Sequence, residues 1–224
     1  MDHTLEIKGL THSFGERSIF SDAGISCKTG EITGIFGRNG TGKSTLFKIL
    51  IGRLKTDKAE IFIDGQFIGN KTNLNSLIAY HPQEIMLPKT MLVRDVIAIY
   101  IKEELQNNVH YSRGMAKLEN QRVSKLSLGQ QRYVQFLLVI NLPQHFILLD
   151  EPFSMVEPLY KELIKEKLLE YKPIKAFLIT DHYYLDVLDI ADKACMIKDG
   201  KIVSIAKAED LIRNEYLSER SIIV

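Results

Sequence analysis

Short apolar runs alternate along this chain with segments whose apolar residues recur every three or four positions. The first pattern is typical of β-strands and the second of amphipathic helices. The runs that we predict as strands are residues 5–7 (ended by Gly9), 18–27, 32–36, 61–63, 77–80, 146–149, 176–180, 194–197 and 202–205. The segments that we predict as helices are residues 46–50, 131–142, 159–171, 183–190 and 208–217. Because strands and helices alternate in the second half, we expect an α/β core with a mostly parallel sheet.

Residues 84–125 interrupt this alternation with a helical pattern, and within them a polar, weakly patterned section covers residues 106–121. The apolar residues that we expect on one helical face are Val93, Val96, Ile97, Tyr100, Ile101 and Leu105. No internal repeat or low-complexity linker divides the chain. We therefore expect one domain, residues 1–224, in which a helical insert at 84–128 separates the core segments 1–83 and 129–224.

The composition is that of an ordinary globular protein, with 45% hydrophobic and 25% charged residues among 224. A net charge of +1 gives no reason to expect a nucleic-acid partner. The two cysteines, Cys27 and Cys195, form no metal-ligand pattern and are typical of buried thiols in a reducing compartment. The chain has no apolar run of 18 residues and no signal-peptide character at its N-terminus, so we expect a cytoplasmic location.

A glycine-rich loop, which we call the phosphate loop (residues 37–45), lies between a predicted strand and a predicted helix. It fits the pattern G-x-x-x-x-G-K-[S/T]. The backbone N–H groups of such a loop can point at a phosphate chain, and the start of the helix adds partial positive charge. We expect Lys43 to reach the β- and γ-phosphates of a nucleoside triphosphate and Ser44 to ligate Mg²⁺. The residues expected to bind the nucleotide here are Gly37, Arg38, Asn39, Gly40, Thr41, Gly42, Lys43, Ser44 and Thr45.

Two acidic residues, Asp150 and Glu151, directly follow the apolar strand predicted at 146–149. An unbroken apolar run is typical of a strand covered on both faces. Ligands of open α/β sheets bind beyond the carboxyl ends of the strands, which places both acids beside the phosphate loop. We expect Asp150 to hold Mg²⁺ through its water shell, and Glu151 to orient or deprotonate the attacking water.

The segment 126–130, Leu-Ser-Leu-Gly-Gln, resembles the LSGGQ signature of the ATP-binding subunits of ATP-binding-cassette (ABC) transporters. We call these five residues the signature. The resemblance covers essentially the whole chain and implies a P-loop NTPase (RecA-like) fold with an antiparallel β subdomain and a helical insert. It implies ATP and Mg²⁺ as ligands. It also implies that two subunits close head-to-tail, so that Ser127 and Gly129 contact the γ-phosphate held by the other subunit.

Three further positions match the family's pattern. Gln83 resembles the glutamine that senses Mg²⁺ and the γ-phosphate, and His182 resembles the switch histidine that contacts the γ-phosphate. Phe14 resembles the aromatic residue that stacks on adenine. With Lys43 and Glu151, the resemblance therefore implies a catalytic set of Lys43, Gln83, Glu151 and His182.

Two residues depart from that pattern. Leu128 replaces the first glycine of the signature pair, and Glu157 stands where the family has an aspartate that contacts the partner subunit. If the family glycine has a positive φ, Leu128 is strained by about 1 kcal/mol or more. We expect reduced but real ATPase activity. The alternatives are a nucleotide-binding switch with little or no hydrolysis, and an ABC ATPase without a transport role, for example in cofactor assembly.

The resemblance also implies partners. These are a transmembrane permease subunit and a second cassette, either a second copy of this chain or a paralogue. In the family, a short helix of the membrane subunit docks beside the glutamine loop, which here is followed by the apolar residues 85–88. Core packing explains that apolar tetrad equally well. The resemblance would place the chain on the inner face of the cell membrane, and it is closest to the compact subunits of lipopolysaccharide-export and branched-chain amino-acid transporters.

Overall fold

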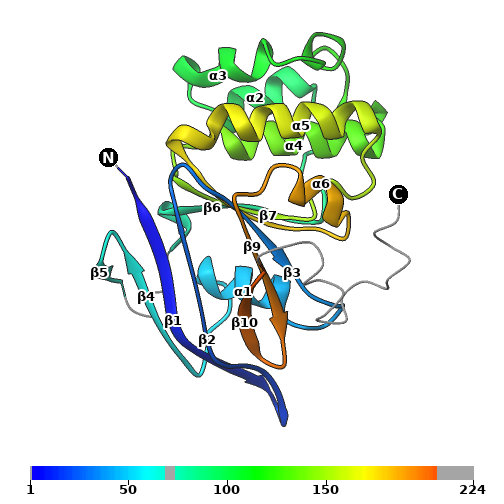
Figure 1. Ribbon diagram of the computed structural model, residues 1–224. Coiled ribbons are helices and arrows are strands. Elements are labelled where there is room, and N and C mark those ends of the chain that lie inside the picture. The colour runs from blue at the N-terminus through cyan, green and yellow to red at the C-terminus, as the bar shows by residue number, and fades with distance from the viewer. Residues whose placement is uncertain (1, 69–73, 206–224) are drawn as a thin grey trace.

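The computed structural model describes residues 2–68 and 74–205. Within them, most of the helices gather at one end of the molecule and long strands extend toward the other (Figure 1). The helix predicted at 208–217 lies outside the described residues. Among the described helices, none is both long enough and apolar enough to cross a bilayer.

A four-stranded antiparallel sheet has the strand order β2-β1-β4-β5. Its strands are β1 (Thr4–Phe14), β2 (Arg17–Lys28), β4 (Lys58–Ile63) and β5 (Gln66–Phe67). The prediction that the first strand ends at Gly9 was wrong. Gly9 has φ 59° and lies at a shift in register between Ile7 and Leu10, so it forms an irregularity through which the strand continues.

A second sheet has six strands in the order β10-β9-β3-β8-β7-β6. Neighbouring strands from β9 to β6 pair in parallel, and only the hairpin of β9 with β10 is antiparallel. The strands are β3 (Ile32–Phe36), β6 (Ile78–His81), β7 (Phe146–Asp150), β8 (Ala176–Thr180), β9 (Lys193–Lys198) and β10 (Lys201–Ile205). The predicted mostly parallel sheet is therefore confirmed.

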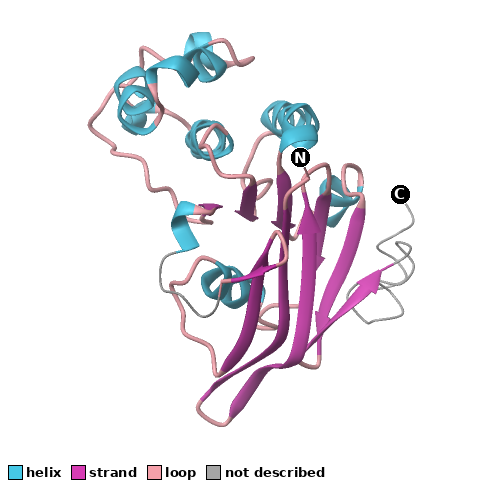
Figure 2. Cartoon of the chain, turned by 90° about the vertical axis from the view of Figure 1, so that its left-hand side faces the viewer, coloured by secondary structure: helices cyan, strands magenta, loops and turns pink. Residues whose placement is uncertain are grey.

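Helix α1 (Lys43–Leu50) lies between the two sheets (Figure 2). Its buried residues Leu46 and Phe47 join one apolar cluster with Leu5 and Ile7 of β1 and with Leu148 of β7. Because this cluster fixes α1 against both sheets, it also fixes the loop that precedes α1.

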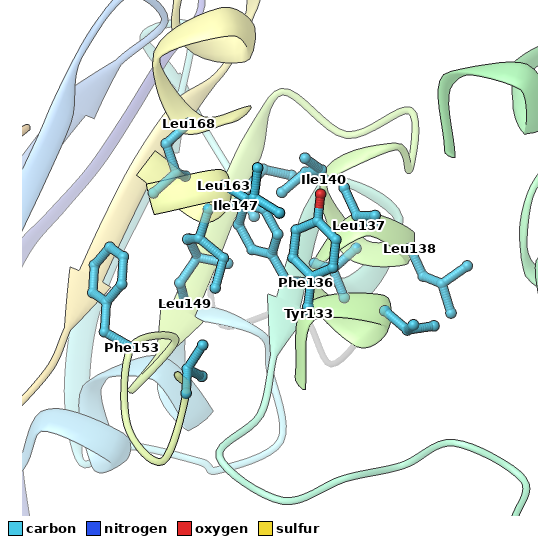
Figure 3. Packing of buried hydrophobic residues seen from close by; sticks show 14 of the residues in the cluster. Tyr133, Phe136, Leu137, Leu138, Ile140, Ile147, Leu149, Phe153, Leu163 and Leu168 are labelled. Atoms are coloured by element: carbon cyan, nitrogen blue, oxygen red, sulfur yellow. The ribbon is translucent and has the colours of Figure 1, made fainter. Parts of the chain in front are cut away.

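The other described helices lie on the opposite face of the six-stranded sheet. They are α2 (Val93–Tyr100), α3 (Glu103–His110), α4 (Leu128–Ile140), α5 (Pro158–Tyr171) and α6 (Tyr184–Leu188), with short 3₁₀ turns at Leu74–Ser76, Met115–Lys117, Val123–Lys125 and Lys172–Ile174. Helices α4, α5 and α6 cover the sheet, while α2 packs on α4 and α3 packs on α2, farther from the sheet (Figure 1). Phe136 of α4, Leu163 of α5 and Ile147 of β7 pack together in their core (Figure 3). This packing sets the position of the residues that follow β7.

The region between β6 and α4 differs from its prediction. The apolar residues expected on one face are divided between two helices, because the backbone of Ile101 is extended (φ −116°, ψ 130°) and ends α2. Tyr100 is half exposed rather than buried, with 49% of its surface accessible. The section thought to be weakly patterned contains Met115 and Leu118, which are fully buried beside α4 and α5 in the same core. The spacing of these apolar residues is not α-helical because one short 3₁₀ turn, Met115–Lys117, lies in this section, and its period differs from that of an α-helix.

Candidate functional site

The phosphate loop follows β3 and leads into α1, as its pattern predicted. Gly42, the residue before α1, has φ 113°, and a β-carbon there would lie 2.7 Å from Ile19 Cγ2 and 2.9 Å from Phe20 Cζ. A β-carbon on Gly37 would lie 2.6 Å from Thr41 Oγ1. Only glycine fits at these two positions, so the backbone can fold closely around a ligand here.

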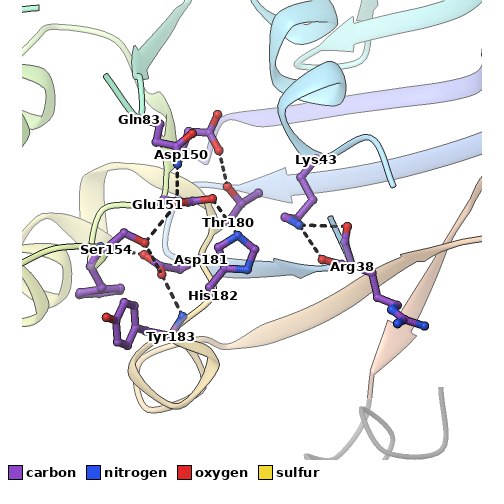
Figure 4. Close-up of polar contacts among 12 residues, drawn as sticks. Arg38, Lys43, Gln83, Asp150, Glu151, Ser154, Thr180, Asp181, His182 and Tyr183 are labelled. Atoms are coloured by element: carbon purple, nitrogen blue, oxygen red, sulfur yellow. Dashed lines mark hydrogen bonds and ion pairs between the residues drawn. The ribbon is translucent and has the colours of Figure 1, made fainter. Parts of the chain in front are cut away.

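Lys43 is buried, and its ammonium group lies inside the loop. Its Nζ donates hydrogen bonds to the carbonyl oxygens of Gly37 (2.5 Å) and Arg38 (3.3 Å) (Figure 4). Burial lowers the pKa of Lys43, while the carboxylates of Glu151 and Asp150 act in the opposite direction. The loop therefore holds a cation that faces two acids and can move outward to an anionic ligand.

Phe14 reaches the same region from the tip of the β1–β2 hairpin. It is paired with Arg17, whose Nη2 donates to the carbonyl oxygen of Gly40 in the phosphate loop (3.0 Å). The ring of Phe14 is 52% exposed and meets His12 edge-on at 4.7 Å. An exposed aromatic face at the edge of the loop is suited to stacking on a base.

Asp150 ends β7, and its carboxylate is almost fully buried. It accepts hydrogen bonds from the hydroxyls of Thr180 (2.8 Å) and Tyr80 (3.0 Å), which follow from the parallel register of the neighbouring strands. Burial, together with the charge of Asp150, raises the pKa of Tyr80. Tyr80 therefore remains a neutral donor that helps to orient the carboxylate.

Glu151 is the centre of a polar cluster just beyond β7 (Figure 4). Gln83 Nε2 donates to Glu151 Oε2 (2.8 Å), and His182 Nε2 lies 3.0 Å from Glu151 Oε1. The sequence-predicted residues Gln83, Glu151 and His182 are thus brought together. Glu151 has φ 54°, a strained value for a residue with a side chain, and its backbone N–H is held by the carbonyl of Thr180 (2.7 Å). The strain turns the side chain out of the strand direction toward these partners.

Sequence reasoning missed Asp181 as a structural member of this cluster. Its buried carboxylate accepts hydrogen bonds from the backbone of Phe153 (2.7 Å) and Tyr183 (2.9 Å) and from Ser154 Oγ (3.2 Å). Burial raises its pKa, although these donors oppose the shift. Asp181 thereby ties the loop after β7 to the loop after β8, which carries His182. The only signal for it in the sequence is a charged residue directly after an apolar strand.

A cavity of about 560 Å³ adjoins this cluster. Ser44, Gln83 and Asp150 line it together, so the hydroxyl, amide and carboxylate oxygens expected near Mg²⁺ share one space. No group of three or more His, Cys, Asp or Glu residues that could hold a metal alone occurs in the described part of the chain. These residues fit Mg²⁺, which is commonly held by one or two protein ligands together with substrate phosphates.

Helix α4 starts at Leu128, within the signature, three residues before the start predicted for this helix. Ser127 is the N-cap residue: its Oγ accepts from the N–H of Gln130 (3.2 Å), and its own N–H donates to Gln130 Oε1 (2.9 Å). Leu128 lies in the helix, where φ is negative, so the strain that a positive φ would impose does not arise. Its side chain is 43% exposed. Gly129 adjoins the carboxylate of Glu157, which also accepts from Ser127 Oγ at 2.9 Å.

Comparison with known proteins identifies the family. A family model described as ABC transporter matches residues 20–154, more than half of the chain. The lipopolysaccharide export system ATP-binding protein LptB of Haemophilus influenzae is 28% identical over 235 residues, covering 96% of this chain and 98% of the relative. An ABC transporter ATP-binding protein of Methanocaldococcus jannaschii is 28% identical over 237 residues, covering 100% of this chain and 86% of the relative.

Solved structures agree on the fold. A nucleotide-free ATP-binding cassette from an ABC transporter matches with a TM-score of 0.80 and 24% identity, covering 96% of each chain. An ATP-binding subunit of an ABC transporter matches with a TM-score of 0.80 and 21% identity, covering 93% of this chain and 92% of the other. The predicted α/β fold of the P-loop NTPase class is thus confirmed. The chain belongs to the ABC transporter family, as one of its ATP-binding cassettes and as an ATPase.

Proposed function

We propose that this cassette hydrolyses Mg²⁺-bound ATP and thereby powers transport by a separate membrane permease subunit. The observation that carries the proposal is the juxtaposition of Lys43, inside its glycine-lined loop, with the Glu151 carboxylate, which Gln83 and His182 hold. Phosphoryl transfer requires mainly positioning and charge stabilisation, and these residues can supply both.

Each residue then has a role. The phosphate loop cradles the triphosphate and Phe14 stacks on adenine. Ser44, Asp150 and Gln83 would hold Mg²⁺, which would neutralise charge on the phosphates. Glu151 accepts a proton from the attacking water or orients it, and His182, 3.0 Å from Glu151, lies on the same side and can contact the γ-phosphate.

A second cassette completes the site in this proposal. Ser127 and Gly129 lie at the start of α4, where backbone N–H groups and the helix dipole favour an anion. We propose that two cassettes, identical or paralogous, close head-to-tail, so that each signature contacts the γ-phosphate held by the other. The chain acts as one domain in which the insert 84–128 separates the core segments 1–83 and 129–224 and ends within the signature.

Replacing Lys43 with alanine tests nucleotide binding. A charged hydrogen bond to phosphate contributes about 1.5–3 kcal/mol, so Lys43→Ala should weaken binding of a fluorescent ATP analogue by at least about tenfold. The matched control is Lys55→Ala, which removes an exposed lysine elsewhere. Equal affinities for the Lys43→Ala and Lys55→Ala proteins, measured by titration with Mg²⁺ present, would contradict the assignment of the phosphate site.

We propose that the membrane partner binds at the apolar side of the cavity. Met86, Leu87 and Leu138 line it beside Gln83, and Met86 is 63% exposed although it is apolar. An apolar helix of a permease docked here would contact the residue that adjoins Mg²⁺, which gives a direct route for coupling. We therefore propose that the cassette lies on the cytoplasmic face of the membrane, attached through this surface.

Met86→Asp should release the permease without loss of ATP binding, because burying an unpaired carboxylate in an apolar contact is costly. The measurement is co-purification of membrane protein with the tagged cassette from a detergent extract. The control is Ile99→Asp, which alters an equally exposed residue (64%) that does not line the cavity. Undiminished co-purification of the Met86→Asp protein would show that this surface is not the docking site.

A further inference from the structure

Glu157 has an unusual position for a residue at the start of a helix. It is the N-cap residue of α5, yet its side chain makes no capping hydrogen bond to α5. Instead the side chain reaches the start of α4, where Oε1 accepts a hydrogen bond from Ser127 Oγ (2.9 Å). Glu157 thus joins the N-termini of two helices through one carboxylate.

The second carboxylate oxygen lies against Gly129. A β-carbon built on Gly129 would be 1.8 Å from Glu157 Oε2 and 2.8 Å from Glu157 Cδ. No other residue at position 129 would leave room for the carboxylate. The two groups that Glu157 contacts, Ser127 and Gly129, are the two that the proposed function assigns to the γ-phosphate.

The Glu157 carboxylate and a γ-phosphate are both anions that this position can bind in the same way. A carboxylate at the start of a helix is stabilised by the partial positive charge there, as a phosphate would be. The Ser127 hydroxyl has a single proton, which is donated to Glu157, while its lone pair accepts from the Gln130 N–H. Ser127 therefore cannot donate to a phosphate oxygen until Glu157 leaves.

We propose that Glu157 occupies the anion position of the signature in the separate subunit, and that ATP held by a partner subunit must displace it for the dimer to close. This autoinhibitory contact rests on the proposed function of the signature. It sets the ATP concentration at which two cassettes associate. It also keeps a negative charge at the dimer surface that repels the triphosphate until the carboxylate turns away.

The length of the side chain is what makes the contact possible. Aspartate is shorter by one carbon–carbon bond, about 1.5 Å, so from the same backbone it would not reach Ser127 Oγ. Glu157→Asp therefore keeps the charge but removes the contact, and Glu157→Ala removes both. Since Glu157 is exposed, neither change disturbs the core.

The test measures ATP-driven dimerisation by sedimentation velocity. All proteins in the test also carry Glu151→Gln, so that ATP is not hydrolysed during the measurement. We expect Glu157→Asp and Glu157→Ala to lower the half-maximal ATP concentration for dimerisation about tenfold, which corresponds to about 1.4 kcal/mol. Glu162→Asp, a matched change on the exposed side of α5, should leave it unchanged. Binding of a fluorescent ATP analogue at protein concentrations too low for dimerisation should be equal in all four proteins.

The outcomes separate the inference from the proposed function. If both Glu157 variants bind the analogue normally but dimerise at the same or a higher ATP concentration than the parent, the autoinhibitory contact is refuted and the ATP site stands. If the parent and both variants bind ATP but none of them dimerises, the role of the signature in trans is refuted, and the inference with it. If the parent binds no analogue, the proposed ATP site itself is wrong.

Discussion

Glu151→Gln should lower the steady-state rate of phosphate release by about 10²-fold or more, because a positioned general base contributes a factor of about 10²–10⁴. Glutamine has the same length and can still accept the hydrogen bond that Gln83 donates at 2.8 Å. It cannot take a proton from water. The variant should therefore fold, bind ATP as the parent does, and fail only in turnover.

The measurement is a coupled phosphate assay on purified cassette, or on its complex with the permease, with binding of the ATP analogue measured in parallel. Glu60→Gln, which changes an exposed glutamate of β4, is the control for altered net charge. If the Glu151→Gln protein turned over as fast as the parent, the chain would be a nucleotide-binding protein whose activity comes from elsewhere. If it lost ATP binding too, Glu151 would serve as a ligand rather than as a base.

The elements around the site could be predicted from the sequence because each has a strong local signal. The strand at 176–180 matches β8 residue for residue, since an unbroken apolar run is favourable only between two covered faces. The phosphate loop was predicted from glycines whose missing β-carbons the structure explains, at Gly37 and Gly42. The approach of Glu151 to Gln83 followed from the family resemblance, not from periodicity.

Other features depend on contacts between distant residues and left no local signal. Asp181 looks like an ordinary charged residue after a strand, yet it is fully buried because it satisfies the backbone of two loops. The contact of Glu157 with Ser127 joins residues 30 positions apart, and sequence alone suggested only that Glu157 would reach toward a partner. No glycine or proline marks the break after Tyr100, where the backbone of Ile101 is extended and α2 and α3 pack against each other.

Acid should destabilise this cassette through His81, which lies at the end of β6, two residues before Gln83. The ring is fully buried and faces Phe136 at 6.5 Å. Burial, with a smaller contribution from the charge of Arg132, lowers the pKa of His81 to about 4. In the unfolded chain the imidazole takes up its proton near its ordinary pKa of about 6.5, so between these two values the unfolded state binds more protons than the folded one.

The free energy of unfolding should therefore fall by about 3 kcal/mol as the pH is lowered from about 6.5 to about 4, with no loss from this residue above that range. Because carboxylates also titrate below pH 5, the measurement is the difference in pH dependence between the parent and His81→Leu, taken from urea unfolding at a series of pH values. His81→Leu should flatten the curve by that amount, even if its stability at pH 7.5 is altered by repacking. His145→Leu, which removes an exposed histidine, is the matched control for the loss of an imidazole. Parallel curves for the parent and His81→Leu would mean that His81 is protonated in the folded state near its ordinary pKa, with water or a charged group reaching the ring between β6 and α4.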